Sequence, residues 1–244
     1  MKISENIKNI IYRALKKYSK SSFRPTRDFN QFFEHIKKIG FYPGTVIDVG
    51  AAKGTPPLQS AFKDAYFIWF EPLKEFVESL RVLTKDYAGE VHQCALMATS
   101  KKGSIFRTKD LFGSSVMHTI NNREDNRIEE IEIKTLDGVL AGRDLARPYL
   151  LKVDCQGGDY QVVLGGKEIL KLCEIVILEV SFFKFWGSQH PEPLQILNYM
   201  DKQGFAIYDI LDGLFRPLDN ALGQVDFVFV KKDGMFRLNH AWNN

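Results

Sequence analysis

The chain has 244 residues, of which 45% are apolar, so it can bury one substantial core and is typical of a globular protein rather than a disordered or fibrous one. Its formal net charge of +3 is small and both signs are mixed along most of the chain, which argues against nucleic acid as a partner. No window approaches the roughly 18 to 20 uninterrupted apolar residues that a membrane-spanning helix needs.

The first 40 residues are predicted to form a basic, helical extension, and residues 41–244 the main domain. Lys8 and Arg13 interrupt the opening segment, so it lacks the apolar region of a signal peptide. Apolar residues nevertheless recur there at helical spacing, at Ile3, Ile7, Ile10, Ile11 and Leu15. We expect this helix to pack on its own domain or on a neighbouring subunit of a homo-oligomer. Docking on an anionic membrane surface or a partner protein is the alternative.

Alternating strands and helices are predicted from residue 41 onward. The expected strands are 45–49, 66–70, 91–96, 149–153, 175–180, 205–210 and 226–230. The expected helices are 28–38, 57–62, 73–84, 159–170 and 193–203. This alternation predicts a Rossmann-like, doubly wound α/β fold with a mostly parallel, seven-stranded sheet. Residues 211–224 are too irregular for a crossover helix, so the last strand is expected to run antiparallel.

Residues 98–147 interrupt this rhythm with short alternating pieces at 104–107 and 130–134 and a polar, charged run between them. Long polar segments inside a compact domain are more often binding loops than filler, so we place substrate contacts here. Ser114, Ser115 and His118 fall in this segment. His118 is a candidate base because histidine titrates near neutral pH, although a solvated loop histidine is the commoner case.

Three cysteines lie within apolar runs and lack any C-x-x-C spacing: Cys94, Cys155 and Cys173. Neither a disulfide framework nor a zinc site is therefore expected, and no other metal site is predicted. We interpret the cysteines as reduced and buried, and we expect the protein to be cytoplasmic.

A turn of small residues follows the strand at 45–49 in the stretch Thr45-Val-Ile-Asp-Val-Gly-Ala-Ala-Lys-Gly54. Gly50, Ala52 and Gly54 allow backbone N–H groups and the next helix to approach a ligand closely. Such turns also occur for packing alone, so this signal is weak by itself. Glu71 strengthens it, because it follows Gly50 at about the 20-residue spacing at which an acidic residue meets ribose hydroxyls in doubly wound folds. The pair predicts a nucleoside cofactor.

The loop favours S-adenosylmethionine over a dinucleotide. The pyrophosphate fingerprint G-x-G-x-x-G is incomplete here, and Asp48 precedes the loop, where it would repel phosphate but suit a cationic amino-acid group. S-adenosylmethionine carries such a group, and methyl transfer from it needs no metal because the leaving thioether is neutral. The alternative is a nicotinamide-dependent oxidoreductase. Glu71 favours it, whereas the incomplete glycine fingerprint and Asp48 argue against it.

Several motifs occur in the order seen in FkbM-type S-adenosylmethionine-dependent methyltransferases, which the chain resembles over about residues 41–231. They are the 45–54 stretch, Phe70-Glu-Pro72, Thr135-Leu-Asp137, Leu151-Lys-Val-Asp-Cys-Gln-Gly-Gly-Asp159 with Val163-Leu-Gly-Gly166, and Ile177-Leu-Glu-Val180. The resemblance implies a class I methyltransferase that methylates a hydroxyl, often of a sugar or polyketide-like product. It also implies that the cofactor is surrounded by Asp48, Gly50, Ala52, Gly54, Glu71, Pro72 and Asp154, with Cys94 and Ala95 beside the adenine.

Carboxylates at strand tips are the candidate catalytic residues. Asp154 follows the strand at 149–153, where open α/β sheets bind ligands, so it is our first choice for a general base or positioning residue. Capping of the following helix is the alternative role. Glu179 lies within an apolar run and needs either a substrate hydroxyl or an ion pair. Lys152 is interpreted as an ion-pair partner, with Asp154 or an acceptor as its contact.

Aromatic residues follow Glu179 at Phe182, Phe183, Phe185 and Trp186. They are expected to form a core patch, or else to contact the apolar face of a sugar ring or a lipid-like acceptor. We therefore predict a methyltransferase that acts on a hydroxyl, most simply that of a sugar or glycan, with Asp154, Glu179 and His118 as catalytic candidates. A non-catalytic scaffold that retains the fold is the alternative.

Overall fold

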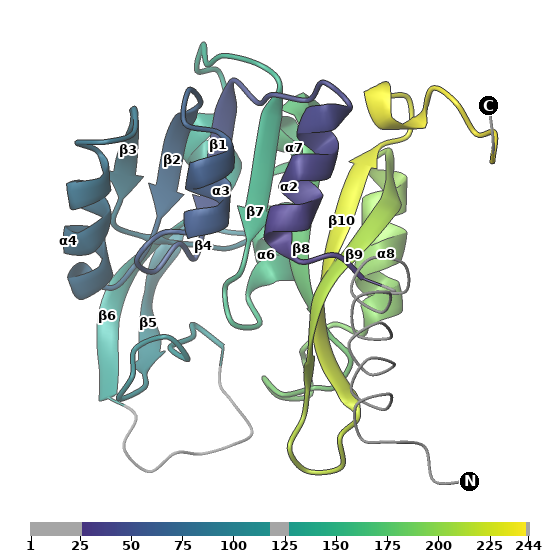
Figure 1. Ribbon diagram of the computed structural model, residues 1–244. Coiled ribbons are helices and arrows are strands. Elements are labelled where there is room, and N and C mark those ends of the chain that lie inside the picture. Colours follow the sequence, from purple (N-terminus) through teal and green to yellow (C-terminus); the bar gives the residue numbers. More distant parts are fainter. Residues whose placement is uncertain (1–25, 118–126, 243–244) are drawn as a thin grey trace, which may run out of the picture.

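The computed structural model describes residues 26–117 and 127–242, so the predictions for residues 1–25 lie outside the described part. Seven strands form one sheet in the order β3-β2-β1-β7-β8-β10-β9 (Figure 1). Their bounds are β1 (Thr45–Val49), β2 (Tyr66–Phe70), β3 (Gly89–His92), β7 (Tyr149–Val153), β8 (Cys173–Ser181), β9 (Phe205–Phe215) and β10 (Leu222–Lys231). Only β10 runs against its neighbours β8 and β9. The predicted mostly parallel, Rossmann-like sheet and its antiparallel last strand are confirmed.

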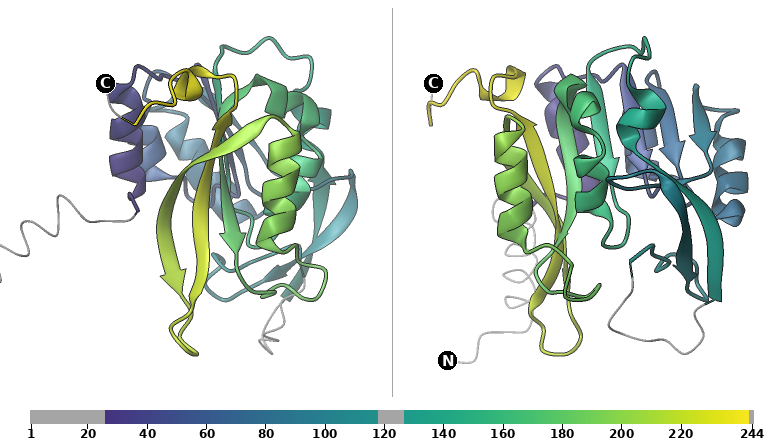
Figure 2. Two further views of the ribbon diagram at one scale, coloured as in Figure 1. Left: turned by 90° about the vertical axis from the view of Figure 1, so that its right-hand side faces the viewer. Right: turned by 180° about the vertical axis from the view of Figure 1, so that it is seen from behind.

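Helices cover both faces of the sheet (Figure 2). One face carries α2 (Phe29–Lys38), α3 (Pro56–Ala61) and, at the β3 edge, α4 (Lys74–Leu83). The opposite face carries α5 (Leu136–Leu140), α6 (Asp159–Leu164), α7 (Lys167–Leu172) and α8 (Pro193–Lys202). A short 3-10 helix, η1 (Met235–Arg237), follows β10. Strands such as β1 and β7 are buried along their whole length between the helical layers, and their side chains are apolar except for Thr45 and Asp48 of β1 and Lys152 of β7.

The strand order reverses between β1 and β7. From β1 the chain moves outward through β2 to β3, and it returns to the other side of β1 with β7 and β8. Backbone loops at the carboxyl ends of β1 and β7 therefore diverge from one point, which is where open α/β sheets form their ligand crevice.

Helix α2 is fixed at its start and along its inner face. The Asp28 side chain accepts the N–H of Gln31, and the Gln31 side chain accepts the N–H of Asp28, which completes a capping box. The helix buries Phe32, Phe33 and Ile36 in the hydrophobic core between α2 and the sheet. This packing joins α2 to the sheet, while the division of the chain at residue 40 stays a prediction.

The interruption at residues 98–147 contributes two strands to a second, three-stranded sheet, whose third strand precedes it. Strands β4 (Ala95–Leu96), β6 (Arg127–Lys134) and β5 (Lys101–Arg107) lie in the order β4-β6-β5, with β5 and β6 antiparallel. This sheet lies below β1 and β2 in Figure 1, beside the carboxyl ends of those strands. The single strand expected at 91–96 is wrong: the chain turns at Cys94, whose N–H donates to the His92 carbonyl, and then enters the second sheet.

Two other expectations differ from the structure. The helix expected at 159–170 is broken into α6 and α7 at the consecutive glycines Gly165 and Gly166, and Gly165 packs so closely on Met97 that an added Cβ would come within 2.3 Å of its carbonyl oxygen. Residues 211–224 belong to a long β9–β10 hairpin, whose register shifts near Gln224 disguise the alternation of a regular strand. In the described residues no helix has both the length and the apolarity that a membrane crossing requires.

The packing of α2 can be tested by truncating one buried ring. Phe33 lies 5.4 Å from Phe62 between ring centroids, so Phe33→Ala leaves a cavity and should lower the free energy of unfolding by about 3 to 5 kcal/mol. Urea denaturation measures this change. The exposed neighbour Glu34→Ala is the control and should stay within about 0.5 kcal/mol of the parent. Equal, small effects of both changes would contradict the packing described for α2.

Candidate active site

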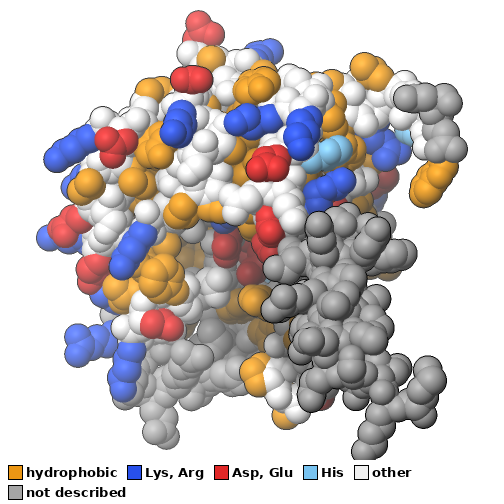
Figure 3. Space-filling view, in the orientation of Figure 1, with side chains coloured by type: hydrophobic (Ala, Val, Ile, Leu, Met, Phe, Trp, Pro, Cys, Tyr) orange, Lys and Arg blue, Asp and Glu red, His pale blue; other side chains and the backbone are white. Residues whose placement is uncertain are grey.

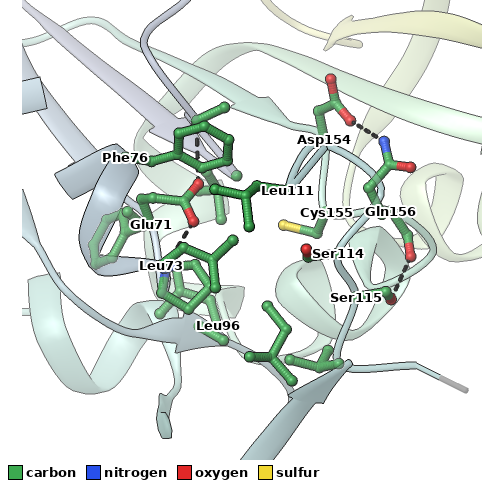
Figure 4. Close-up of a pocket in the computed structure, with 18 of the residues that line it drawn as sticks. Glu71, Leu73, Phe76, Leu96, Leu111, Ser114, Ser115, Asp154, Cys155 and Gln156 are labelled. Carbon is green, nitrogen blue, oxygen red and sulfur yellow. Dashed lines mark hydrogen bonds between the residues drawn. The ribbon is translucent and has the colours of Figure 1, made fainter. Parts of the chain in front are cut away.

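A cavity opens at the carboxyl ends of β1, β2 and β7, at the reversal of strand order. It encloses about 790 Å³, part of it open to solvent. The main sheet contributes Gly50, Glu71 and Asp154, and the second sheet and its loop contribute Leu96, Ile105, Leu111 and Ser115. Glu71 and Asp154 stand on opposite sides of the cavity, with Cys155 and Gln156 beside Asp154 (Figure 4).

The turn after β1 packs directly on the turn after β7. Gly50 has φ +71°, and a Cβ added there would lie 1.9 Å from the Asp154 carbonyl oxygen. Only glycine tolerates both the positive φ and this approach. The N–H groups of Gly50 and Ala51 donate to the Phe70 carbonyl at 3.0 and 3.2 Å, so the turn is also held to β2.

Glu71 braces the floor of the cavity. Its two carboxyl oxygens accept the N–H groups of Ala52 and Leu73, each at 2.9 Å. The residue is only 5% exposed, and burial raises the pKa of Glu71 to about 7, although the two amide hydrogen bonds act in the opposite direction. A carboxylate offers about four acceptor positions, so two remain for hydroxyl groups in the cavity.

An apolar slot lies next to Glu71. Leu73 and Phe76 from the start of α4 face Leu96 and Ile105 from the second sheet, with Pro72, Cys94 and Ala95 completing the lining. Burial raises the pKa of the Cys94 thiol to about 11, so it stays protonated and acts as an apolar side chain. The slot therefore suits a flat, weakly polar ring beside the Glu71 carboxylate.

Two predicted cofactor residues do not line the cavity. Asp48 is 0% exposed beneath the turn, where its Oδ2 accepts the Thr55 hydroxyl at 3.0 Å and its Oδ1 has no hydrogen-bond partner. Burial raises the pKa of Asp48. Gly54 donates its N–H to the Ala51 carbonyl and packs against Gln59. Both residues support the turn from behind, and their contact with a cofactor stays a prediction.

Asp154 lines the cavity rather than capping the next helix. Its side chain is 36% exposed and accepts Lys152 Nζ and Gln156 Nε2, both at 3.3 Å. Gly158 occupies the N-cap position of α6, and Asp159 Oδ1 accepts the Cys155 N–H at 3.1 Å. The helix-cap alternative for Asp154 is therefore wrong. The expected ion pair between Lys152 and Asp154 is present.

Glu179 belongs to a row of carboxylates beside the cavity. The register of β7 with β8 ends one residue before Asp154, at Val153 opposite Leu178, so Asp154 comes next to Glu179. Glu179 in turn pairs with Asp226 on β10. Burial raises the pKa of Glu179 well above its usual value, and the carboxylates of Asp154 and Asp159 raise it further. Among the described residues Glu179 has no ion-pair partner.

Two more carboxylates lie beside the site: Asp159, which ends the family motif quoted above, and Asp226, which sequence reasoning missed. Burial raises the pKa of each to about 7, with the Asp154 carboxylate adding to the effect. Asp226 lies in an apolar run much like that around Glu179, which was the available signal. Acidic side chains gather in a recess near the middle of the α2 face (Figure 3). In the described part of the chain, no His, Cys, Asp or Glu group has the arrangement of a metal site.

The loop after β5 closes one side of the cavity. Ser115 Oγ donates to the Gln156 carbonyl at 2.7 Å, which ties this loop to the turn after β7. Ser114 Oγ accepts the Thr108 N–H at 3.1 Å, and both serines line the cavity. His118 lies outside the described residues. Of the three cysteines, Cys94 and Cys173 are buried, whereas Cys155 is partly exposed in the cavity wall, and none forms a disulfide.

Residues 48–207 match the family model for the methyltransferase FkbM domain. The chain belongs to the FkbM methyltransferase family. The family resemblance of the sequence motifs is thereby confirmed, and S-adenosylmethionine is the cofactor rather than a nicotinamide dinucleotide. The cavity fits this group, because Glu71 retains acceptor positions for ribose hydroxyls and the neighbouring slot has an apolar lining.

Solved structures of methyltransferases are similar to this chain. The FkbM methyltransferase from Methylobacillus flagellatus KT matches with a TM-score of 0.50 and 16% identity, over 83% of this chain and 48% of that chain. The present chain thus spans about half the length of that structure. Magnesium protoporphyrin IX methyltransferase from Synechocystis, solved with bound SAM, matches with a TM-score of 0.46 and 12% identity, over 83% of this chain and 77% of that chain. No curated protein matches the chain.

The raised pKa of Glu71 makes a prediction for stability. Between its usual value of 4.5 and about 7, folded Glu71 binds a proton that the unfolded chain releases, so this contribution to stability is complete below 4.5 and is lost as the pH rises to about 7. The loss is on the order of 3 kcal/mol at most. Urea denaturation across this range should show a flatter pH profile for Glu71→Gln than for the parent. Exposed Glu78→Gln is the control, and a Glu71→Gln slope equal to that of the parent would contradict the prediction.

Proposed function

We propose that this FkbM-family protein transfers the methyl group of S-adenosylmethionine to a hydroxyl oxygen of a sugar or a related polyhydroxylated acceptor. The observation that carries the proposal is the placement of Asp154. Its carboxylate borders the cofactor cavity, yet its side chain is 36% exposed, so it can face a bound cofactor and an acceptor at once.

Different parts of the cavity would bind different parts of the cofactor. The turn at Gly50 and Ala52 would hold the amino-acid end, Glu71 the ribose hydroxyls, and the slot between Leu73 and Leu96 the adenine. When bound, S-adenosylmethionine supplies an electrophilic methyl group on a sulfonium whose departure leaves a neutral thioether.

Asp154 is the proposed general base. A hydroxyl that donates a hydrogen bond to its carboxylate gains nucleophilic character as the proton moves to Asp154. Lys152 and Gln156 each donate to one oxygen of this carboxylate, so its orientation is fixed before an acceptor arrives. Glu179 is the second candidate, one strand further along the same edge.

A second hollow supports a sugar as the acceptor. It encloses about 920 Å³, much of it open, between the loop after β8 and the β9–β10 hairpin, and its lining includes Phe185, Phe215 and Arg216. Trp186 lines this hollow, and its ring packs against Gly157, next to the cavity residue Gln156, so the hollow lies beside the cofactor cavity. The buried amide nitrogen of Gln224 has no hydrogen-bond partner here. Aromatic faces with a nearby donor suit a ring that has an apolar face and hydroxyl edges.

Calorimetric titration with S-adenosylhomocysteine tests the cofactor part of the proposal. We expect micromolar binding of S-adenosylhomocysteine and none of NAD(H). Glu71→Ala should weaken the affinity at least tenfold, because it removes the acceptor positions for the ribose and unpairs the Ala52 and Leu73 amides. Exposed Glu78→Ala is the matched control and should bind like the parent. Failure of the parent to bind S-adenosylhomocysteine would contradict the proposal.

Asp154→Asn tests the base. With acceptors found by screening hydroxylated sugars, release of S-adenosylhomocysteine should fall about 10²- to 10⁴-fold in this variant, while affinity for S-adenosylhomocysteine stays within a few fold. Asparagine keeps the shape of the side chain but cannot take the proton. Undiminished turnover in Asp154→Asn would reject Asp154 as the base. A parent that binds S-adenosylhomocysteine but methylates no hydroxylated acceptor would reject the substrate class and favour a scaffold role.

A further inference from the structure

Lys152 is a buried cation within the row of carboxylates. Its side chain is only 6% exposed, and its ammonium lies 3.3 Å from Asp154 Oδ2 and 3.9 Å from Asp48 Oδ1. Burial opposes the charge of Lys152, but the carboxylates of Asp154, Asp48 and Asp226 outweigh burial and raise the pKa of the ammonium. Lys152 is therefore charged throughout the physiological range.

The sheet register explains why one lysine faces so many acids. Asp48 of β1 stands directly opposite Lys152 of β7, so both side chains leave the sheet on the same face. Asp154 lies two residues further along, next to Glu179 of β8 and then Asp226 of β10. Asp159 of α6 adds a further carboxylate. In the described part of the chain no other cation acts on Asp48, Glu179 and Asp226 together.

One ammonium cannot keep all of these carboxyls ionised. Packed carboxylates repel one another, and the group that receives the charged hydrogen bond ionises most readily. The distance to Asp154 is that of a hydrogen bond, whereas the distance to Asp48 is too long for one and leaves Asp48 Oδ1 unpaired. Burial favours the protonated forms of Glu179 and Asp226, whose raised pKa values agree with this division.

We propose that Lys152 is a positioning residue that selects Asp154, rather than Glu179 or Asp226, as the ionised carboxylate of the site and orients it along the cofactor cavity. The catalytic consequence rests on the proposed role of Asp154 as base, but the assignment of charge does not. Lys152 thereby links β1, which carries the glycine turn, to the carboxylate at the end of β7.

The first experiment measures ionisation without any acceptor. Carboxyl ¹³C NMR of aspartate-labelled protein follows the titration of Asp154, whose resonance is assigned by its loss in Asp154→Asn. In Lys152→Met the Asp154 signal should titrate at least one pH unit higher than in the parent. Lys232→Met removes the same charge from an exposed pair with Asp201 and should leave the Asp154 titration unchanged. An unchanged Asp154 titration in Lys152→Met overturns the proposal.

The second experiment measures catalysis. The acid limb of the kcat profile should move at least one pH unit higher in Lys152→Met, which is a tenfold loss of kcat on that limb, while KM and affinity for S-adenosylhomocysteine change little. In an Asp154→Asn background, Lys152→Met should have no further effect on kcat, because Lys152 acts through Asp154. An equal loss in both backgrounds would show that Lys152 acts independently and would overturn the proposal.

A third variant keeps the test open if Lys152→Met does not fold. Asp48→Asn retains Lys152 and removes its second carboxylate, so the Asp154 signal should stay in place or titrate at lower pH. A move to higher pH overturns the proposal. Because the NMR measurements need no substrate, they distinguish a wrong assignment of charge from a wrong proposed function, which calorimetry with S-adenosylhomocysteine tests separately.

Discussion

The approach of Gly50 to the backbone carbonyl of Asp154 is the constraint on which the site depends. A Cβ at position 50 would lie 1.9 Å from that oxygen, so the turns after β1 and β7 meet only because position 50 has no side chain. Their contact places the cofactor loop beside the candidate base. The register of the same two strands places Lys152 of β7 opposite Asp48 of β1. The parallel pairing of these two central strands thus sets both the shape of the cavity and the charges beneath it.

The strand predictions were most accurate where the local sequence alone determines where the strand begins and ends. The strands at 45–49, 66–70 and 149–153 were predicted to the residue, because each is a short apolar run that ends at a polar or small residue. The break after Leu164 was missed although Gly165 and Gly166 follow it, whereas the packing of Gly165 on the distant Met97 carbonyl was not predictable from the local sequence. The two strands of the β9–β10 hairpin were predicted, but their extension through residues 211–224 was missed because bulges and Gly, Asp and Pro residues hide the period of two.

The same distinction applies to the site. Glu71 and Asp154 could be predicted from the sequence, because spacing along the chain and position at a strand end are local properties. Both residues line the cavity. The carboxylates that neighbour Asp154 could not be predicted in this way. Asp226 is distant in sequence and comes beside Glu179 only through the antiparallel register of β10 with β8. A buried acid in an apolar run signals that a partner is needed, but it does not say which strand supplies it.

Glu71 illustrates how a binding site can exist before its ligand arrives. The carboxylate already holds the Ala52 and Leu73 amides, and these amides belong to the two segments that flank the cavity floor. The floor therefore need not be ordered at the moment of association, and little conformational entropy is lost there. Affinity for the nucleoside then depends mainly on direct contacts. Substitutions that loosen this brace would weaken binding through disorder of the free protein, even where every contacting atom remains.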